Sequence, residues 1–156
     1  MATYQERMLE GASAVELVVA LYDGILRFLY GAADAVDRGD ATSRRAAVKR
    51  ALDIIIHLQA RLRMDIGGRP AQVLSEFYAS VFAQILQASQ SASRAKFEHA
   101  IECVKTVRDA WRQVARETDP IAANAKRAAA AFDSSGSSRA TQDPYAQQDV
   151  GGGWTA

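Results

Sequence analysis

Apolar residues recur at helical spacing along almost the whole stretch from Val15 to Thr118. The sequence has three prolines, Pro70, Pro120 and Pro144, so the stretches before Pro70 and between Pro70 and Pro120 are free to be helical. No segment alternates polar and apolar residues in the way that a half-buried strand does. The sequence therefore predicts an all-α fold.

The first predicted helix runs from about Val15 to Arg38. Ser13 and Glu16 have the spacing of a capping box, which favours Ser13 as the N-cap residue. Gly39 follows the last periodic residue and suits the end of a helix. This helix is the most apolar segment of the chain.

Turn and capping residues separate three more helices. The second begins near Thr42 or Ser43 and ends at the pair Gly67–Gly68. The third opens at Pro70, which suits a first helical turn, and the fourth follows Ser93, a good N-cap residue. Short connections between long helices favour antiparallel neighbours, so we expect an antiparallel up-down four-helix bundle.

The bundle is expected to occupy residues 15–118, between two segments of different character. Residues 1–14 form an N-terminal segment. Residues 119–156 begin with an Ala-rich stretch, which is predicted to form a short and marginal fifth helix. From Asp133 onward Gly, Ser, Gln and Asp dominate, which predicts a disordered tail. The alternative interpretation of this tail is a partner-binding segment that contains Trp154.

Apolar residues cover roughly two-thirds of the circumference of the first predicted helix, whereas a bundle helix usually needs a narrower stripe. Its polar strip includes Asp23 and Arg27, which are one turn apart and suited to an exposed ion pair. Two interpretations remain open. Either the helix is central and covered on three sides, or it leaves apolar surface that a partner helix covers.

Residues that would support enzyme chemistry are missing from the sequence. Neither His57 nor His99 follows a glutamate at the spacing of a helical diiron site, and the single cysteine, Cys103, cannot form a thiolate zinc cluster. No glycine-rich phosphate loop follows a strand. We therefore expect no enzymatic activity, no cofactor and no metal site.

The charge balance and the lack of targeting signals argue against several other classes of protein. The 19 Lys and Arg residues against 18 Asp and Glu leave a net charge of +1, which gives no overall electrostatic case for nucleic acid. Charged residues interrupt the most apolar stretch, Val15–Val36, so no membrane span is expected. The N-terminus lacks the pattern of a secretory signal, and we expect a cytoplasmic protein.

The second predicted helix is strongly basic. Its charged residues are six cations and two anions: Arg44, Arg45, Lys49, Arg50, Arg61, Arg63, Asp53 and Asp65. An ordinary solvated face is one interpretation, and attraction of an acidic partner is another. Contact with nucleic-acid phosphates is less favoured because no base-stacking aromatic residues accompany the cations.

The run Gly11–Leu29 resembles the signature of the flagellar export chaperone family FliS. Its most specific part is Leu-Tyr-Asp-Gly at residues 21–24. The matching positions are Ala12, Ser13, Glu16, Leu17, Val18, Leu21, Tyr22, Asp23, Gly24 and Phe28. Blocks at Lys49–Leu62, Leu74–Ala88 and Val107–Val114 resemble later parts of the family pattern, so the resemblance covers about residues 4 to 118.

The resemblance implies a small helical bundle that acts as a cytosolic chaperone. Members of the family bind the disordered C-terminal region of flagellin, which becomes helical on the chaperone, and so prevent premature polymerisation before type III export. Other flagellar export components are further implied partners. The resemblance also suggests that Tyr4, Met8 and Leu9 occupy the binding groove when no partner is present.

These arguments together predict a groove on the first and third helices. The hypothesis assigns partner contacts to nine residues: Tyr4, Leu9, Leu17, Leu21, Tyr22, Ile25, Phe28, Leu74 and Tyr78. The alternative hypothesis is a helical adaptor or regulatory protein, in which the same groove binds a helix of another partner.

Overall fold

A computed structural model describes residues 3–118, 124 and 127–131, with the side chains at 4, 5, 7–10, 12 and 13 excepted. The chain divides into two compact units, residues 1–119 and 120–156. In the second unit Asn124 and residues 127–131 are helical, within the Ala-rich stretch predicted as a fifth helix. The predicted disordered tail from Asp133, including Trp154, lies outside the described residues.

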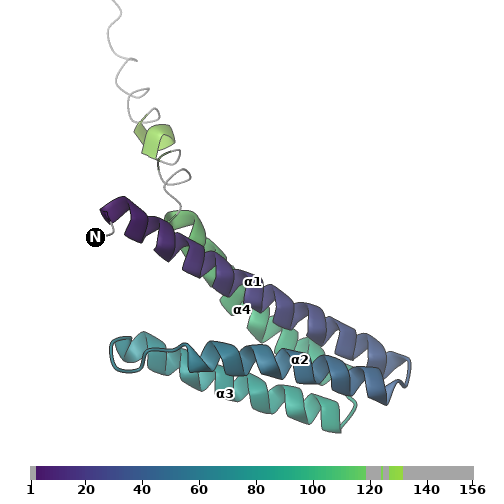
Figure 1. The fold of residues 1–156 in the computed structure, drawn as a ribbon. Coiled ribbons are helices and arrows are strands. Elements are labelled where there is room, and N and C mark those ends of the chain that lie inside the picture. Colours follow the sequence, from purple (N-terminus) through teal and green to yellow (C-terminus); the bar gives the residue numbers. More distant parts are fainter. Residues whose placement is uncertain (1–2, 119–123, 125–126, 132–156) are drawn as a thin grey trace, which may run out of the picture. The chain divides into compact units, whose positions relative to one another are not determined.

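Four long helices make up the first unit: α1 (Tyr4–Asp37), α2 (Ala41–Ala60), α3 (Gly68–Gln90) and α4 (Arg94–Thr118). Successive helices run in opposite directions (Figure 1). α1 packs against α2 and α4, and α3 packs against the same two helices. The described residues contain no strand, and the predicted antiparallel four-helix bundle is confirmed.

The start of α1 differs from the prediction. The helix begins at Tyr4, with Thr3 rather than Ser13 as its N-cap residue. The Thr3 Oγ1 atom accepts a hydrogen bond from the Glu6 amide at 3.4 Å, and the Thr3 amide donates to Glu6 Oε2 at 2.7 Å. Since nothing between Tyr4 and Ser13 interrupts a helix, the capping box nearer the terminus sets its start.

The other helix boundaries mostly follow the capping signals. Gly39 has a φ of +66° just beyond α1, and Ser93 caps α4 by accepting a 3.2 Å hydrogen bond from the Lys96 amide. Asp40 is the N-cap residue of α2. The predicted end of α2 at Gly67–Gly68 is wrong, because the helix stops at Ala60 and residues 61–67 form the turn that reverses the chain.

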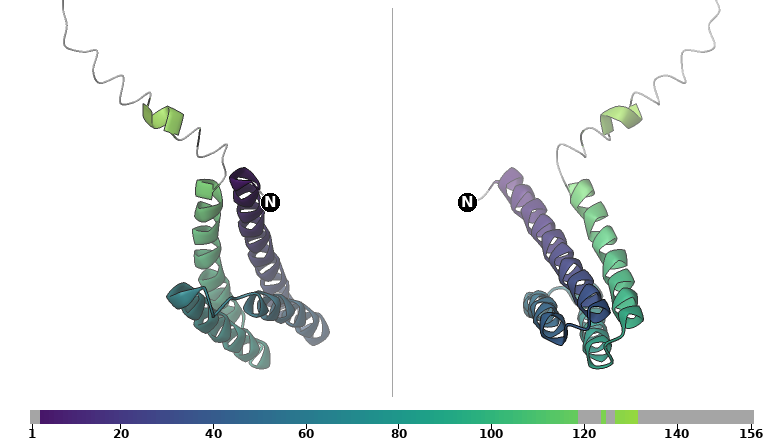
Figure 2. Two further views of the ribbon diagram at one scale, coloured as in Figure 1. Left: turned by 60° about the vertical axis from the view of Figure 1, so that its left-hand side comes forward. Right: turned by 90° about the vertical axis from the view of Figure 1, so that its right-hand side faces the viewer.

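Helix length decides how far each pair of helices overlaps. At 1.5 Å per residue the 34 residues of α1 span about 51 Å, and the 20 residues of α2 span about 30 Å. The start of α1 and the end of α4 extend beyond α2 and α3, and the α1–α4 pair diverges from the α2–α3 pair at that end (Figures 1 and 2). This end of the bundle is the open end.

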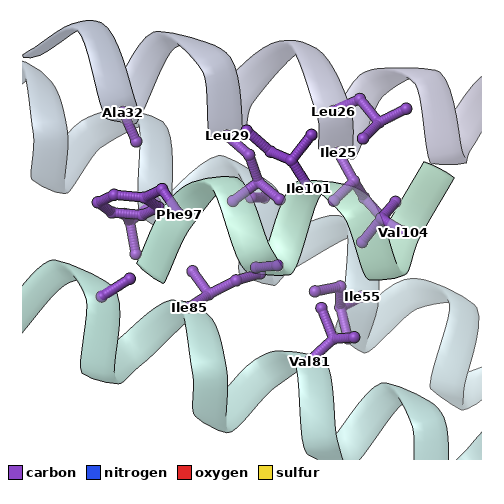
Figure 3. Close-up of a cluster of buried hydrophobic side chains, with 14 of the residues drawn as sticks. Ile25, Leu26, Leu29, Ala32, Ile55, Val81, Ile85, Phe97, Ile101 and Val104 are labelled. Carbon is purple, nitrogen blue, oxygen red and sulfur yellow. The ribbon is translucent and has the colours of Figure 1, made fainter. Parts of the chain in front are cut away.

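The core fills the opposite part of the bundle. In Figure 3, side chains from all four helices converge there, and Ala32 of α1 points toward the Phe97 ring of α4. The largest fully buried side chains include Tyr22, Leu29 and Ile85. The described residues contain no buried polar or charged residue, so apolar burial is the main stabilising term of the bundle.

Candidate protein-binding groove

A first apolar pocket of about 240 Å³ lies at the open end of the bundle, and all four helices contribute to it. It lies where the first half of α1 faces the end of α2 and the first turns of α3. Its lining residues are Ala14, Leu17, Val18, Leu21, Leu58, Arg61, Leu62, Leu74, Tyr78 and Trp111. Nine of these ten side chains are apolar or aromatic, which makes the pocket a site for apolar groups.

A second apolar pocket of about 480 Å³ lies between α3 and α4. Its lining residues are Arg69, Pro70, Val73, Leu74, Val107, Ala110, Trp111 and Val114. Leu74 and Trp111 line both pockets, so they form the wall between the two. We call the two adjoining pockets together the apolar groove.

Several large apolar side chains of the groove are exposed to solvent. The exposed fraction is 46% for Leu17, 51% for Val73 and 38% for Val114. Each lies on a different helix, α1, α3 and α4, so the exposed apolar surface is not a single stray side chain. Exposed apolar side chains gathered around one groove usually mark a site that another molecule covers.

The structure brings four of the nine predicted contact residues into the groove. Leu17, Leu21, Leu74 and Tyr78 line the first pocket, although Tyr78 itself is 3% exposed and presents little surface. Each interpretation of the first helix matches the exposure of a different part of it, and covering of the exposed part by a partner helix stays a prediction. Its start borders the groove, and its end is buried by the other helices.

Three other predicted residues lie away from the groove surface. Tyr22 and Ile25 are buried in the core, in a cluster to which all four helices contribute. Phe28 is half-buried and lies beneath two guanidinium groups, those of Arg27 at 5.2 Å and Arg50 at 5.7 Å from the ring centroid. None of these three side chains lines either pocket of the groove, and their assignment to partner contacts stays a prediction.

The predicted N-terminal plug falls on side chains outside the described set. The backbone of Tyr4, Met8 and Leu9 belongs to α1 and continues its axis. The assignment of Tyr4 and Leu9 to partner contacts stays a prediction.

Sequence reasoning missed the contribution of α4 and of the first turn of α3. Trp111 lies on the apolar stripe of α4 that begins with Phe97, Ile101 and Val104, and it separates the two pockets. Val107, Ala110 and Val114 recur at helical spacing beside that stripe, and this second stripe was the available signal. Val73 carries no signal of its own, because a single exposed valine is ordinary.

A buried pair of phenols lies beneath the first pocket, which Tyr78 lines and Tyr22 does not. The Tyr22 hydroxyl donates a 2.9 Å hydrogen bond to the Tyr78 hydroxyl, and the two rings are 6.3 Å apart. Burial raises the pKa of both phenols above the ordinary value, and for Tyr22 the hydrogen bond with Tyr78 raises it further. Both groups are neutral at physiological pH, so the pair places no charge beneath the pocket.

The ion pair expected within α1 does not form. Asp23 instead contacts α4, where Arg108 Nη1 lies 3.2 Å and Arg112 Nη2 lies 3.7 Å from its carboxylate. Arg108 interrupts the apolar stripe of α4, since it stands between Val104 and Trp111 at helical spacing. Its side chain is only 17% exposed, and this contact explains why a cation is accepted at that position.

The described residues hold no group of three or more His, Cys, Asp or Glu residues that could bind a metal ion. None of the described helices combines the length and the apolar run that a bilayer crossing requires. What the groove can do chemically is bind an apolar surface. An amphipathic helix is the secondary structure that presents such a surface while keeping its own backbone hydrogen bonds.

Comparison with known proteins finds a matching family and several relatives. Residues 1–118 match the family model described as flagellar protein FliS. The chain is 30% identical over 112 residues to the flagellar secretion chaperone FliS of Vibrio cholerae, which covers 72% of this chain and 82% of that protein. It is 29% identical over 110 residues to the FliS of Salmonella typhimurium, covering 70% of this chain and 82% of that protein. The chain is 32% identical over 102 residues to the FliS of Campylobacter jejuni, which covers 65% of this chain and 80% of that protein.

Proposed function

Because this chain belongs to the FliS family of flagellar secretion chaperones, we propose that it binds the C-terminal region of flagellin in the cytoplasm. Binding would keep flagellin from polymerising before export and keep it competent for the type III flagellar export apparatus. The chaperone role is that of the family. Flagellin as the bound protein and the groove as the bound site are parts of the proposal.

The observation that carries the proposal is the apolar groove. A chaperone for a disordered segment needs apolar surface that stays hydrated until the segment arrives. The side chains of Leu17, Val73 and Val114 meet this requirement, since all are exposed and all border the groove or its pockets. Covering them removes apolar area from water, which contributes about 25 cal/mol of favourable free energy for each Å² buried.

The size of the groove suits a helical ligand. A segment that is disordered in solution loses conformational entropy when it becomes helical, and this loss reduces the net affinity. A single small pocket would offer too little contact to offset the loss. Two adjoining pockets that share Leu74 and Trp111 allow one ligand to extend from one to the other.

The direct experiment is calorimetric titration of the full chain with flagellin and with flagellin that lacks its C-terminal region. We expect saturable binding with a negative heat-capacity change for intact flagellin, because apolar surface is buried. We expect no binding for the truncated form. Equal binding of both forms, or none of either, would contradict the proposal.

The groove is tested by substitutions at exposed positions, which leave the core intact. We expect Leu17→Ser, Val73→Ser and Val114→Ser each to weaken flagellin binding, by about tenfold for Leu17→Ser. Ile56→Ser is the matched control, because Ile56 is 55% exposed on α2 and lines neither pocket. If the control weakens binding as much as the groove variants do, the groove is not the binding site.

A further inference from the structure

Each pocket of the apolar groove has a single charged residue in its lining, and both are arginines. Arg61 lines the first pocket and Arg69 lines the second. No carboxylate lines either pocket. The groove is therefore apolar along its floor and cationic at two points of its edge.

Neither guanidinium has a carboxylate partner within the part of the chain that the structure describes. The nearby acid, Asp65, is already engaged, since its carboxylate lies 3.1 Å from Arg63 Nη2. That contact lowers the pKa of Asp65 below its ordinary value. The arginines of the α1–α4 contact, Arg108 and Arg112, are likewise paired with Asp23.

The two arginines stand on fixed backbone at the two ends of one short connection. Arg61 is the C-cap residue of α2, and its amide donates to the carbonyl oxygens of Leu58 and Gln59. Arg69 lies in the first turn of α3, which has no acidic residue and no side-chain N-cap. A cation at that position is unfavourable for the helix by itself, because the helix dipole is positive at its start. An incoming carboxylate would reverse this effect.

We infer that the segment which fills the groove is an amphipathic helix whose apolar face is bordered by carboxylates that pair with Arg61 and Arg69. This inference rests on the proposed use of the groove as a protein-binding site, and not on which protein is bound. An entirely apolar helix would cover the edge without offering either cation a partner. A helix with basic borders would be repelled by both.

Two synthetic peptides of equal length test the inference on the full chain. Both carry the same Leu and Val face and the same helix-favouring residues, and they differ only at the border positions, which hold Glu in one and Lys in the other. We expect the Glu-bordered peptide to bind about tenfold more tightly at about 50 mM salt, with the preference reduced at about 500 mM salt. Calorimetric titration gives both affinities.

The variant Arg61→Gln/Arg69→Gln should remove the preference and leave the affinity for the Lys-bordered peptide equal or higher. The control Arg45→Gln/Lys96→Gln changes the net charge equally at two exposed positions that line neither pocket of the groove. It should keep the preference. If the wild-type chain shows no preference, or if both double variants lose it alike, the inference is overturned.

Sedimentation of the full chain without peptide examines a competing occupant. A dimer that blocks both peptides and that the Arg61→Gln/Arg69→Gln variant leaves intact would show the groove filled by a second copy of the chain without these two ion pairs, and would overturn the inference. The flagellin titration fails or succeeds independently of these results. Binding of the Glu-bordered peptide without binding of flagellin would leave this inference in place and remove the proposed substrate.

Discussion

The hydroxyl of Tyr22 on α1 donates a 2.9 Å hydrogen bond to the hydroxyl of Tyr78 on α3, directly beneath the apolar groove. α1 and α3 lie diagonally across the bundle, so this bond joins two helices that are not packed neighbours. It also separates the groove from the closed core, because Tyr22 is fully buried and Tyr78 lines the first pocket.

Removing the acceptor of this bond should destabilise the fold. In Tyr78→Phe the Tyr22 hydroxyl stays buried without its acceptor, and we expect a loss of about 1–2 kcal/mol in the free energy of unfolding. In Tyr22→Phe the Tyr78 hydroxyl can turn toward water in the pocket, so the loss should be smaller. Urea denaturation of the single variants and the double variant measures both. Additive losses in the double variant would contradict a direct bond between the two phenols.

The same pair predicts a stability change at alkaline pH. Burial raises the pKa of both phenols in the folded state, so the folded chain keeps these protons above pH 10 while the unfolded chain loses them. The stabilisation is complete below pH 10 and is lost as the pH rises through the folded-state values. The free energy of unfolding should fall with pH by up to about 1.4 kcal/mol per unit for each phenol. Urea denaturation curves measured from about pH 8 to about pH 11, at intervals of roughly one pH unit, test this trend.

Tyr30→Phe serves as the control for that experiment, since Tyr30 is 46% exposed and is not part of the buried pair. It should retain the alkaline decrease, and Tyr22→Phe/Tyr78→Phe should reduce it. An unchanged slope in the double variant would assign the decrease to other groups.

The contact of Asp23 with α4 should contribute more than a typical surface ion pair. Asp23→Asn removes the charge that faces Arg108 and Arg112, and we expect a loss of about 1 kcal/mol, because Arg108 is largely shielded from solvent. Asp53→Asn is the comparison, since the Lys49–Asp53 pair is exposed on α2 and should contribute less than about 0.5 kcal/mol. Thermal unfolding of both variants ranks them. Equal losses would show that shielding of Arg108 has no effect.

The turn between α3 and α4 contains a residue in a conformation that favours glycine. Ala92 has a φ of +45°, which an L side chain rarely adopts. Ala92→Gly should raise the free energy of unfolding by about 0.5–1 kcal/mol, because relief of this strain exceeds the added entropy of the unfolded chain. Ala95→Gly, in the first turns of α4, should instead lower it. A destabilised Ala92→Gly variant would contradict the assigned conformation.

The predicted N-terminal plug has a simple test. If residues 1–12 occupy the groove when no partner is present, their removal should tighten flagellin binding or promote self-association, since the closed fraction no longer competes. Calorimetry and sedimentation of the shortened chain measure these effects. Unchanged affinity together with an unchanged oligomeric state would exclude the plug. Because the backbone of Tyr4–Asp37 is one helix, a plug would also require this helix to unwind near its start.

The spacing of apolar residues and the capping residues determined the number of helices, their order and their antiparallel packing. Gly39 and Ser93 mark boundaries that the structure confirms, because each acts on its own neighbours along the chain. The early block around Leu-Tyr-Asp-Gly was specific enough to indicate the family. Such signals are local, so they survive without knowledge of the tertiary contacts.

Only the tertiary structure decided which apolar residues stay exposed. Leu17 and Ile25 are indistinguishable on a helical wheel that is apolar over most of its circumference, yet one borders the groove and the other is buried. The difference depends on how far α2 and α3 extend along α1, which spacing within one helix cannot encode. In the same way Asp23 pairs with Arg108 and not with Arg27. A carboxylate is attracted more strongly to a cation that is shielded from water on another helix than to an exposed cation on its own helix.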